Sequence, residues 1–311
     1  MSALDRLGIG LWTLQSSATR PGNHTALYRR FAAAAVHAEE LGFHSVWAAE
    51  HRLWYDGFCP QLLHAQAFVA ARTSRIRLGQ AMLIGPQHDP AALARNAATL
   101  EALSGGRLEL GLGLGHRDAE FDALGLRRDR RGRLFEPVLD AVAGIGSRLW
   151  LGGMTTPTLE RAVRRNAGLM LPQSLLPGEL GTLLAEFRGL GGTGAIGILR
   201  DVWVEPEPEL AERARERVVA HYVEEAGAWW VLKGTVGFGN PEQLARQRER
   251  ILRTVAIGSP EEVAERLRAD IEAGVELHCL RLAYDFTGAA ELHEQLERVA
   301  ADIAPLLEES A

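Results

Sequence analysis

The chain has few cysteines, no long apolar run and no excess of positive charge. Its two cysteines, Cys59 and Cys279, lie far apart and form no CxxC pair, so we do not expect disulfides to organise the fold. No apolar run approaches the roughly 20 residues of a membrane span. The N-terminus MSALDRLGIG also lacks the basic and long apolar segments of a secretion signal. We therefore expect a cytoplasmic protein that neither spans a membrane nor is exported by that route.

The formal net charge of the 311 residues is −6 and the isoelectric point is about 6.0. Nucleic acids and anionic lipids would meet no net positive field, which argues against either as a partner. A local basic cluster does occur at Arg127, Arg128, Arg130, Arg131 and Arg133. It fits a solvated loop and helix start, or alternatively an anion clamp.

Several motifs of common enzyme classes are missing. The histidines His24, His37, His64, His221 and His293 show no ligand spacing, and there is no HExxH, HxH or carboxylate cluster, so we expect no bound metal. No GxSxG elbow marks an acyl-transfer serine. The glycine run GLGLG does not have the GxGxxG spacing of a dinucleotide-binding turn.

Short apolar runs alternate with longer helical patterns along the whole chain, as in repeated βα units on a parallel sheet. This favours a (β/α)8 TIM-like barrel over an open doubly wound sheet, although spacing alone leaves the second possible. We find no linker of domain-boundary composition, so residues 1–311 are expected to form one domain. The eight candidate strands are Leu7–Leu14, Phe43–Ala49, Ile76–Ile84, Leu108–Leu114, Leu149–Leu151, Gly168–Leu171, Ile196–Val204 and Leu277–Ala283.

The segment FHSVWAAEHRLWYDGF, residues 43–58, is the most informative. It begins as a buried strand and ends in the pair Glu50-His51. Residues two apart share a face of a strand, so His51 lies on the face of Trp47 and Glu50 on the opposite one. A histidine at the C-terminal end of a strand occupies the position where α/β folds carry their chemistry. It also fits a strand-end histidine bonded to nearby backbone.

Two glycine-containing segments could approach a ligand closely. Gly111, Gly113 and Gly115 share one face of the fourth strand, and this bare face would either admit a flat ligand or relieve crowding. The sequence LWLGGMTTPTLE, residues 149–160, predicts a strand, a glycine turn and a helix start. Exposed backbone N–H groups and the hydroxyls of Thr155 and Thr156 would suit a phosphate, or simply cap the helix.

Four blocks in this order resemble the bacterial-luciferase-like flavin-dependent oxidoreductases and cover nearly the whole chain. They are AEELGFHSVWAAEH, TSRIRLGQAMLIGPQHDPAALARNAATLEALSGGRLELGLGLG, LWLGGMTTPTLERA and IGSPEEVAERLRADIEAGVELHCLRL. The resemblance implies a TIM-like barrel, often dimeric, that holds a flavin with its phosphate on the loop and helix after strand five.

The resemblance also implies roles for individual residues. His51 looks like the family's catalytic histidine and Glu50 like the acidic residue before it. Ala81-Met82 stands where relatives have a non-proline cis peptide against the flavin ring. Gly113 and Gly115 fall beside the cofactor. The phosphate loop would be Gly152, Gly153, Thr155 and Thr156.

The chain departs from the family pattern at two places. Gly113-Leu114 stands where bacterial luciferase carries a Cys-Arg pair, so Arg117 or Arg95 would have to pair with the phosphate if any arginine does. Long-chain aldehyde luminescence is thus not implied. The segment between Arg133 and Leu149 is shorter than in typical relatives, which predicts a more open pocket.

These observations lead to a two-component monooxygenase that uses FMN, reduced by a separate flavin reductase, and O2 to oxidise a small organic substrate. Relatives with 5-deazaflavin more often read Asp-His at Glu50-His51, which favours FMN. A deazaflavin-dependent hydride transferase and a flavin-binding protein without turnover are the alternatives, and a homodimer is expected from the family. The residues expected to line the substrate side are Trp12, Trp54, Tyr55, Phe58 and His116, with Trp229-Trp230 in a possible cover.

Overall fold

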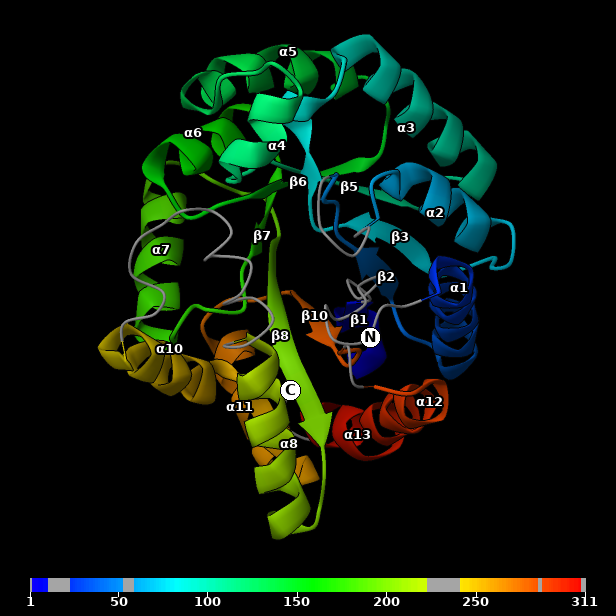
Figure 1. Ribbon diagram of the computed structural model, residues 1–311, viewed down its shortest axis with the longest axis vertical. Coiled ribbons are helices and arrows are strands. Elements are labelled where there is room, and N and C mark those ends of the chain that lie inside the picture. The colour runs from blue at the N-terminus through cyan, green and yellow to red at the C-terminus, as the bar shows by residue number, and fades with distance from the viewer. Residues whose placement is uncertain (1, 11–22, 53–58, 223–240, 285–286, 309–311) are drawn as a thin grey trace.

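The computed structural model describes residues 2–10, 23–52, 59–222, 241–284 and 287–308. Eight parallel strands form a closed barrel in the order β1-β2-β3-β5-β6-β7-β8-β10, and pairing of β10 with both β8 and β1 completes the circle. Helices surround the strands on the outside (Figure 1). The predicted TIM-like barrel is therefore confirmed, and the open sheet is excluded.

The strands have these bounds: β1 Leu7–Gly10, β2 Ser45–Ala48, β3 Arg77–Gln80, β4 Leu83–Ile84, β5 Leu108–Gly113, β6 Arg148–Gly152, β7 Gly168–Leu171, β8 Ile196–Val204, β9 Ala256–Gly258 and β10 Leu277–Arg281. The helices are α1 His24–Leu41, α2 Leu62–Ala70, α3 Pro90–Ser104, α4 Asp118–Ala123, α5 Arg131–Val142, α6 Thr156–Arg164, α7 Pro177–Gly189, α8 Pro208–Ala220, α10 Pro241–Thr254, α11 Pro260–Glu272, α12 Ala289–Arg298 and α13 Ala304–Glu308.

Each of the eight predicted strands contains a barrel strand, with two differences. The run Ile76–Ile84 is divided into β3 and β4, and the Ala81–Met82 peptide between them is cis, as the resemblance implied. The short strand β9 was not predicted; it extends the sheet beyond the outer end of β8. Residues 11–14 of the first candidate strand lie outside the described part of the chain. The assignment of residues 1–311 to one domain stays a prediction.

Local signals in the sequence fix the helix ends. The Ser259 side chain accepts a hydrogen bond from the Glu262 N–H, and the Glu262 carboxylate accepts one from the Ser259 N–H, so this pair caps the start of α11. Helix α1 begins at the capping side chain of Asn23 and ends at Gly42, whose φ of 94° is a left-handed conformation that favours glycine. Among the described residues, no helix has the length and apolar character needed to cross a bilayer.

The barrel interior is filled by two tryptophans. Trp47 of β2 and Trp150 of β6 are both fully buried and meet edge to face, with ring centroids 5.8 Å apart. Glycines on the neighbouring strands make room for them: a Cβ at Gly79 would overlap the Trp47 ring, and one at Gly168 would come within 2.8 Å of Trp150. Side chains on the opposite strand faces, such as Val46, pack outward against the helices. The tryptophan pair therefore closes the barrel below its C-terminal mouth.

Candidate functional site

A cavity of about 390 Å³ lies at the C-terminal ends of the barrel strands, where barrel folds place their chemistry. Six of the strands, or the residues directly after them, contribute to its wall. Its apolar part includes Met82, Leu114, Met170, Pro172 and Leu199. The other lining residues are Ala49, Glu50, His51, Ala81, Ile84, Gly113, Gly115, His116, Arg131, Gly152, Gly153, Met154, Thr155 and Thr158.

The imidazole of His51 lines this cavity and is held by a buried carboxylate. Its Nδ1 lies 3.1 Å from Oε1 of Glu120, a residue of α4 with no exposed surface. The same oxygen accepts a hydrogen bond from the Arg52 N–H at 3.1 Å and lies 3.4 Å from a guanidinium nitrogen of Arg117. These contacts fix the plane of the His51 ring. The ring of His116 meets it edge to face, with centroids 5.9 Å apart.

Glu50 has a different environment from His51, as the alternation of the strand predicts. Its Oε2 accepts hydrogen bonds from the Ile84 N–H at 2.9 Å and from the His88 ring at 2.8 Å, and its Oε1 accepts from Arg52 at 3.4 Å. The residue is 1% exposed. Although Glu50 contributes to the wall, its carboxylate braces the backbone after the Ala81–Met82 peptide. This geometry suits a positioning role.

The glycines in β5 and directly after it differ in their surroundings. A Cβ at Gly111 would collide with the carbonyl oxygen of Gln80, so this glycine permits close approach of β3. Gly113 and Gly115 line the cavity, and a Cβ at Gly113 would meet the Met82 side chain at 3.2 Å. The expected bare face is thus partly covered by Met82. Gly115 also relieves crowding, since its Cβ would come within 2.5 Å of the Ile84 side chain, while both Gly113 and Gly115 line the cavity.

The turn between β6 and α6 forms another edge of the cavity. Gly153 has a φ of 141°, a value that favours glycine, and Thr155 occupies the position before the first residue of α6. The hydroxyls of Thr155 and Thr158 lie 3.2 Å apart, and Thr158 is buried. Thr156, however, donates to Glu186 at 2.7 Å and does not line the cavity. Of the four predicted loop residues, Gly152, Gly153 and Thr155 line the cavity and Thr156 does not. Thr158, which was not predicted, also lines it.

The cation at this edge is Arg131, the first residue of α5. Sequence reasoning proposed Arg117 or Arg95, but Arg117 contacts Glu120, and Arg95 is exposed on α3 and absent from the cavity wall. Arg131 belongs to the basic cluster that was interpreted as solvated surface or anion clamp. Its neighbour Arg127 pairs with Asp129 on the surface. The run therefore contains an arginine in a surface ion pair and another that lines the cavity.

A second buried polar cluster lies where β7, β8 and β10 end. The Tyr222 hydroxyl donates to Asp201 at 2.7 Å and accepts from Arg281 at 2.9 Å and from Gln173 at 3.1 Å. Burial, and then the adjacent Asp201 charge, raise the pKa of Tyr222 well above its ordinary value. The phenol therefore stays protonated and joins the end of α8 to the barrel.

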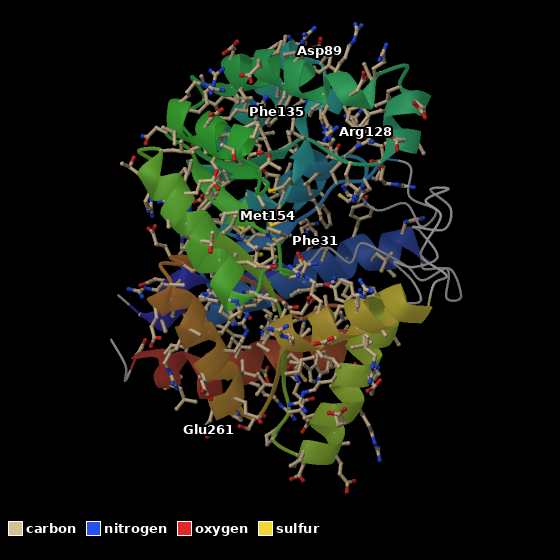
Figure 2. All side chains as sticks on the ribbon, turned by 90° about the vertical axis from the view of Figure 1, so that its left-hand side faces the viewer. Phe31, Asp89, Arg128, Phe135, Met154 and Glu261 are labelled. Carbon is tan, nitrogen blue, oxygen red and sulfur yellow. The ribbon has the colours of Figure 1, made fainter. Side chains whose placement is uncertain are left out.

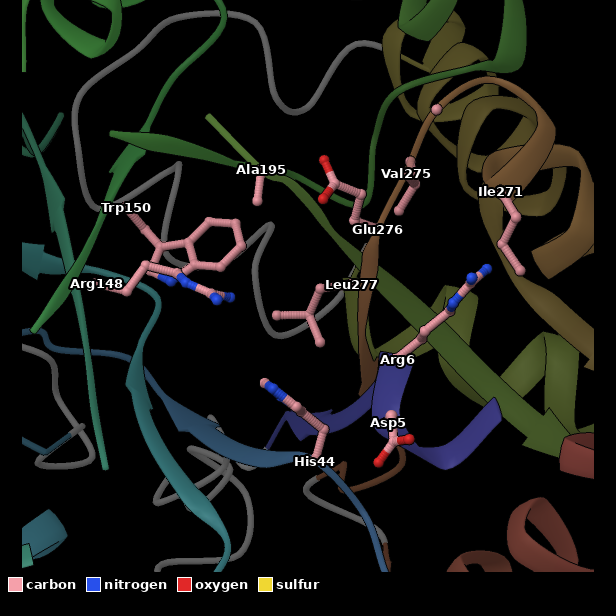
Figure 3. A pocket seen from close by; sticks show the side chains of 11 residues that line it. Asp5, Arg6, His44, Arg148, Trp150, Ala195, Ile271, Val275, Glu276 and Leu277 are labelled. Atoms are coloured by element: carbon pink, nitrogen blue, oxygen red, sulfur yellow. The ribbon is translucent and has the colours of Figure 1, made fainter. Parts of the chain in front are cut away.

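A larger hollow, of about 620 Å³, opens at the opposite end of the barrel (Figure 3). Arg6 and His44 precede strands there, and Glu276 precedes β10. The hollow lies at the N-terminal ends of the strands, the end that serves stability in barrel folds. Trp150 separates it from the mouth. We therefore place the candidate site in the smaller cavity.

Several predicted lining residues, namely Trp12, Trp54, Tyr55, Phe58 and Trp229-Trp230, lie outside the described residues. Within the described part of the chain, no group of three or more histidine, cysteine, aspartate or glutamate side chains is arranged to hold a metal ion. The described site is thus built from an imidazole–carboxylate pair, an apolar wall and a cationic edge. The chemistry of this lining suits an anionic, partly apolar ligand at the mouth of the barrel.

Comparison with known proteins supports the resemblance. Residues 8–148 match the family model of luciferase-like monooxygenases. The monooxygenase RslO1 from Streptomyces bottropensis superposes with a TM-score of 0.81 at 20% identity, covering 96% of this chain and 99% of that one. The oxygenating constituent of 3,6-diketocamphane monooxygenase from Pseudomonas putida, solved in complex with FMN, gives a TM-score of 0.79 at 15% identity, covering 98% and 99%.

Among curated proteins, the F420-dependent glucose-6-phosphate dehydrogenase of Kineococcus radiotolerans is 41% identical over 112 residues, 33% of this chain and 33% of that enzyme. The chain spans about a third of the length of the curated relatives it matches first. Residues 8–148 are thus similar to the luciferase-like monooxygenase family, and the named relatives of the chain include oxidoreductases. The predicted resemblance is confirmed.

Proposed function

We propose that this protein is a flavin-dependent two-component monooxygenase that binds reduced FMN at the barrel mouth and oxidises a small organic substrate with O2. One observation carries the proposal: a single cavity presents a carboxylate-held imidazole, an apolar wall and an edge of arginine, threonines and a helix start. A flavin mononucleotide needs these three surroundings for its reacting ring, its apolar faces and its phosphate.

The chain's residues fit the parts of FMN. The apolar wall of Met82, Met170 and Leu199 suits a flat aromatic ring, since thioethers adapt well to aromatic faces. Arg131 would pair with the phosphate, and the Thr155 and Thr158 hydroxyls would complete the cradle. The start of α6 adds the positive end of the helix dipole, although Pro157 has no N–H and the Thr158 N–H already donates to the Thr155 carbonyl at 2.7 Å. Gly113, Gly115, Gly152 and Gly153 would let the ligand lie close to the main chain.

When bound, the reduced flavin supplies the electrons for O2 activation. The chain's task is to orient the ring, to exclude water and to move protons. His51 suits the last task because an imidazole both donates and accepts protons near neutral pH. Glu120 engages Nδ1, so proton exchange with a ligand would use Nε2 of the same ring. Glu50 acts as a positioning residue, since it holds the Ile84 backbone and His88.

A deazaflavin-dependent hydride transferase is the second candidate. It is supported by the F420-dependent name of the Kineococcus relative. FMN ends in a phosphate monoester, whereas F420 continues beyond its phosphate. Arg131 and the threonines line the cavity and could contact either the terminal phosphate of FMN or the internal phosphate of F420. A flavin-binding protein without turnover is the third candidate, but the carboxylate-held His51 favours catalysis.

Two partners complete the proposal. FMN must arrive reduced, so a separate flavin reductase would supply it. We propose a homodimer only because proteins of the resembling family are often dimeric.

The deciding experiment is a titration of the apo protein with FMN, riboflavin and F420, each oxidised and reduced. FMN should bind more tightly than riboflavin, which lacks the phosphate. The Arg131→Ala variant should bind FMN with an affinity lowered by about 10- to 100-fold, as expected for loss of a charge-assisted contact. Its affinity for riboflavin should be nearly unchanged. Arg127→Ala removes an exposed arginine of the same cluster and is the matched control.

Equal affinity for FMN and riboflavin would contradict the phosphate cradle. Binding of F420 alone, with anaerobic substrate reduction, would replace the first candidate with the second. Ordinary FMN binding with O2-dependent turnover that survives His51→Ala would leave the cofactor assignment in place but remove His51 from the mechanism.

A further inference from the structure

The described methionines gather at one place. The chain contains four methionines, and the three that the structure describes, Met82, Met154 and Met170, all line the cavity at the barrel mouth. Two of them have a packing role. The Met170 side chain is 2% exposed, and a Cβ on Gly197 would come within 2.8 Å of its methyl group. Met82 lies similarly against Gly152, where an added Cβ would come within 2.8 Å of Cγ.

Met154 is different. It is 43% exposed and lies between Gly153 and Thr155 in the turn from β6 to α6, on the side of the barrel seen in Figure 2. Packing does not require an apolar thioether at such an exposed position. The residue is therefore both exposed to solvent and part of the wall of the cavity. Among the described methionines it is thus the one that a small oxidant in solution or in the cavity can reach most easily.

The proposed function supplies such an oxidant, and the present inference rests on it. Reduced flavin that reacts with O2 in the absence of organic substrate releases hydrogen peroxide. We propose that Met154 is a redox-modification site at which this peroxide switches off cofactor binding. One peroxide oxygen bonds to the thioether sulfur as the O–O bond breaks. The sulfur loses two electrons, the peroxide is reduced, and one molecule of water leaves.

The position of Met154 explains why its sulfoxide would matter. The new oxygen carries partial negative charge and stands in the turn whose Gly153 and Thr155 form the proposed phosphate cradle. An apolar, flexible side chain becomes polar and chiral at this point. The affinity for the FMN phosphate therefore falls, and peroxide production falls with the fraction of protein that is loaded. Methionine sulfoxide reductases reverse the change.

The test begins with the apo protein, so its first readout does not depend on turnover. The protein is treated with hydrogen peroxide and each methionine is followed by peptide mass spectrometry. Met154 should convert to the sulfoxide well before Met82 and Met170. FMN titration before and after treatment should show affinity falling by about tenfold, the effect of losing one favourable polar contact. Treatment with a methionine sulfoxide reductase should restore it.

The Met154→Leu variant is compared with itself before and after peroxide, and its FMN affinity should not change on treatment. Oxidation of the three methionines at similar rates would overturn the proposal, and so would Met154 sulfoxide that leaves FMN affinity unaltered. A loss of affinity that also occurs in Met154→Leu would assign the effect to another residue and overturn it as well. Absence of FMN binding before treatment would instead overturn the proposed function, and the switch with it.

Discussion

The contact between Glu120 and His51 gives the sharpest test of the proposed chemistry. Glu120→Gln keeps the shape of the side chain and removes its charge. In the structure the carboxylate is fully buried. Its Oε1 lies 3.1 Å from Nδ1 of His51 and accepts a hydrogen bond from the Arg52 N–H at 3.1 Å. A hydrogen bond to a charged group contributes about 1.5–3 kcal/mol. If that interaction holds the imidazole in its reactive orientation, its loss slows the proton-transfer step by about 10- to 100-fold.

The assay needs no knowledge of the organic substrate. Protein loaded anaerobically with reduced FMN is mixed with O2, and flavin reoxidation is followed by stopped-flow absorbance. The rate of the bound fraction should fall in Glu120→Gln and fall further in His51→Ala, while the dissociation constant for FMN changes little, because neither residue belongs to the phosphate cradle. Thermal unfolding of each variant verifies that it is folded.

Asp118→Asn is the matched control, because Asp118 is an acidic residue in the first turn of the same helix and pairs with Arg128 at the surface. Its reoxidation rate should equal that of the unmodified protein. A Glu120→Gln variant that binds FMN and is reoxidised as fast as Asp118→Asn would refute the assignment of the Glu120–His51 pair to proton transfer.

Three further predictions concern stability. Asp270→Asn should lower the free energy of unfolding by about 3–5 kcal/mol in urea titrations at neutral pH, because it leaves the buried Arg200 guanidinium, bonded at 2.7 and 2.8 Å, without its counter-ion. Burial opposes ionisation of Asp270, but hydrogen bonds led by that of Arg200 hold its pKa well below the ordinary 3.8, so its contribution is present above about pH 4 and is lost as pH falls through the folded pKa. The unmodified protein should therefore lose stability more steeply in acid than Asp270→Asn, and parallel pH profiles would contradict this. Gly79→Ala should cost about 1–3 kcal/mol because its Cβ would overlap the Trp47 ring, and an unchanged melting temperature would show that the barrel interior is more loosely packed than described.

Periodicity predicted the barrel because buried parallel strands appear as short apolar runs between helical stripes. It failed where a feature of the backbone does not change the spacing of apolar residues in the sequence. In the run from Ile76 to Ile84, apolar residues occur on both sides of the cis peptide at Ala81–Met82, so one strand was predicted where two occur. The three residues of β9, Ala256–Gly258, are too few to show alternation.

The site was predicted where its residues are adjacent in sequence and missed where the fold brings distant residues together. His51 is visible at a strand end, but its partner Glu120 is 69 residues away and resembles an ordinary acidic residue in the first turn of a helix. The sequence analysis placed Arg131 in a basic cluster, but nothing in its spacing distinguishes it from the exposed Arg127. A signal existed in the basic cluster, but only the packing of α5 shows which arginine reaches the cavity.

The two buried indoles have a consequence for the order of events in a catalytic cycle. Trp47 and Trp150 leave no passage along the barrel axis, so everything that enters the upper chamber of the described barrel must also leave through its entrance. A cofactor bound against the two indole rings could not leave while a second ligand occupied the entrance. We therefore expect compulsory-order kinetics, in which the flavin is the first molecule in and the last one out.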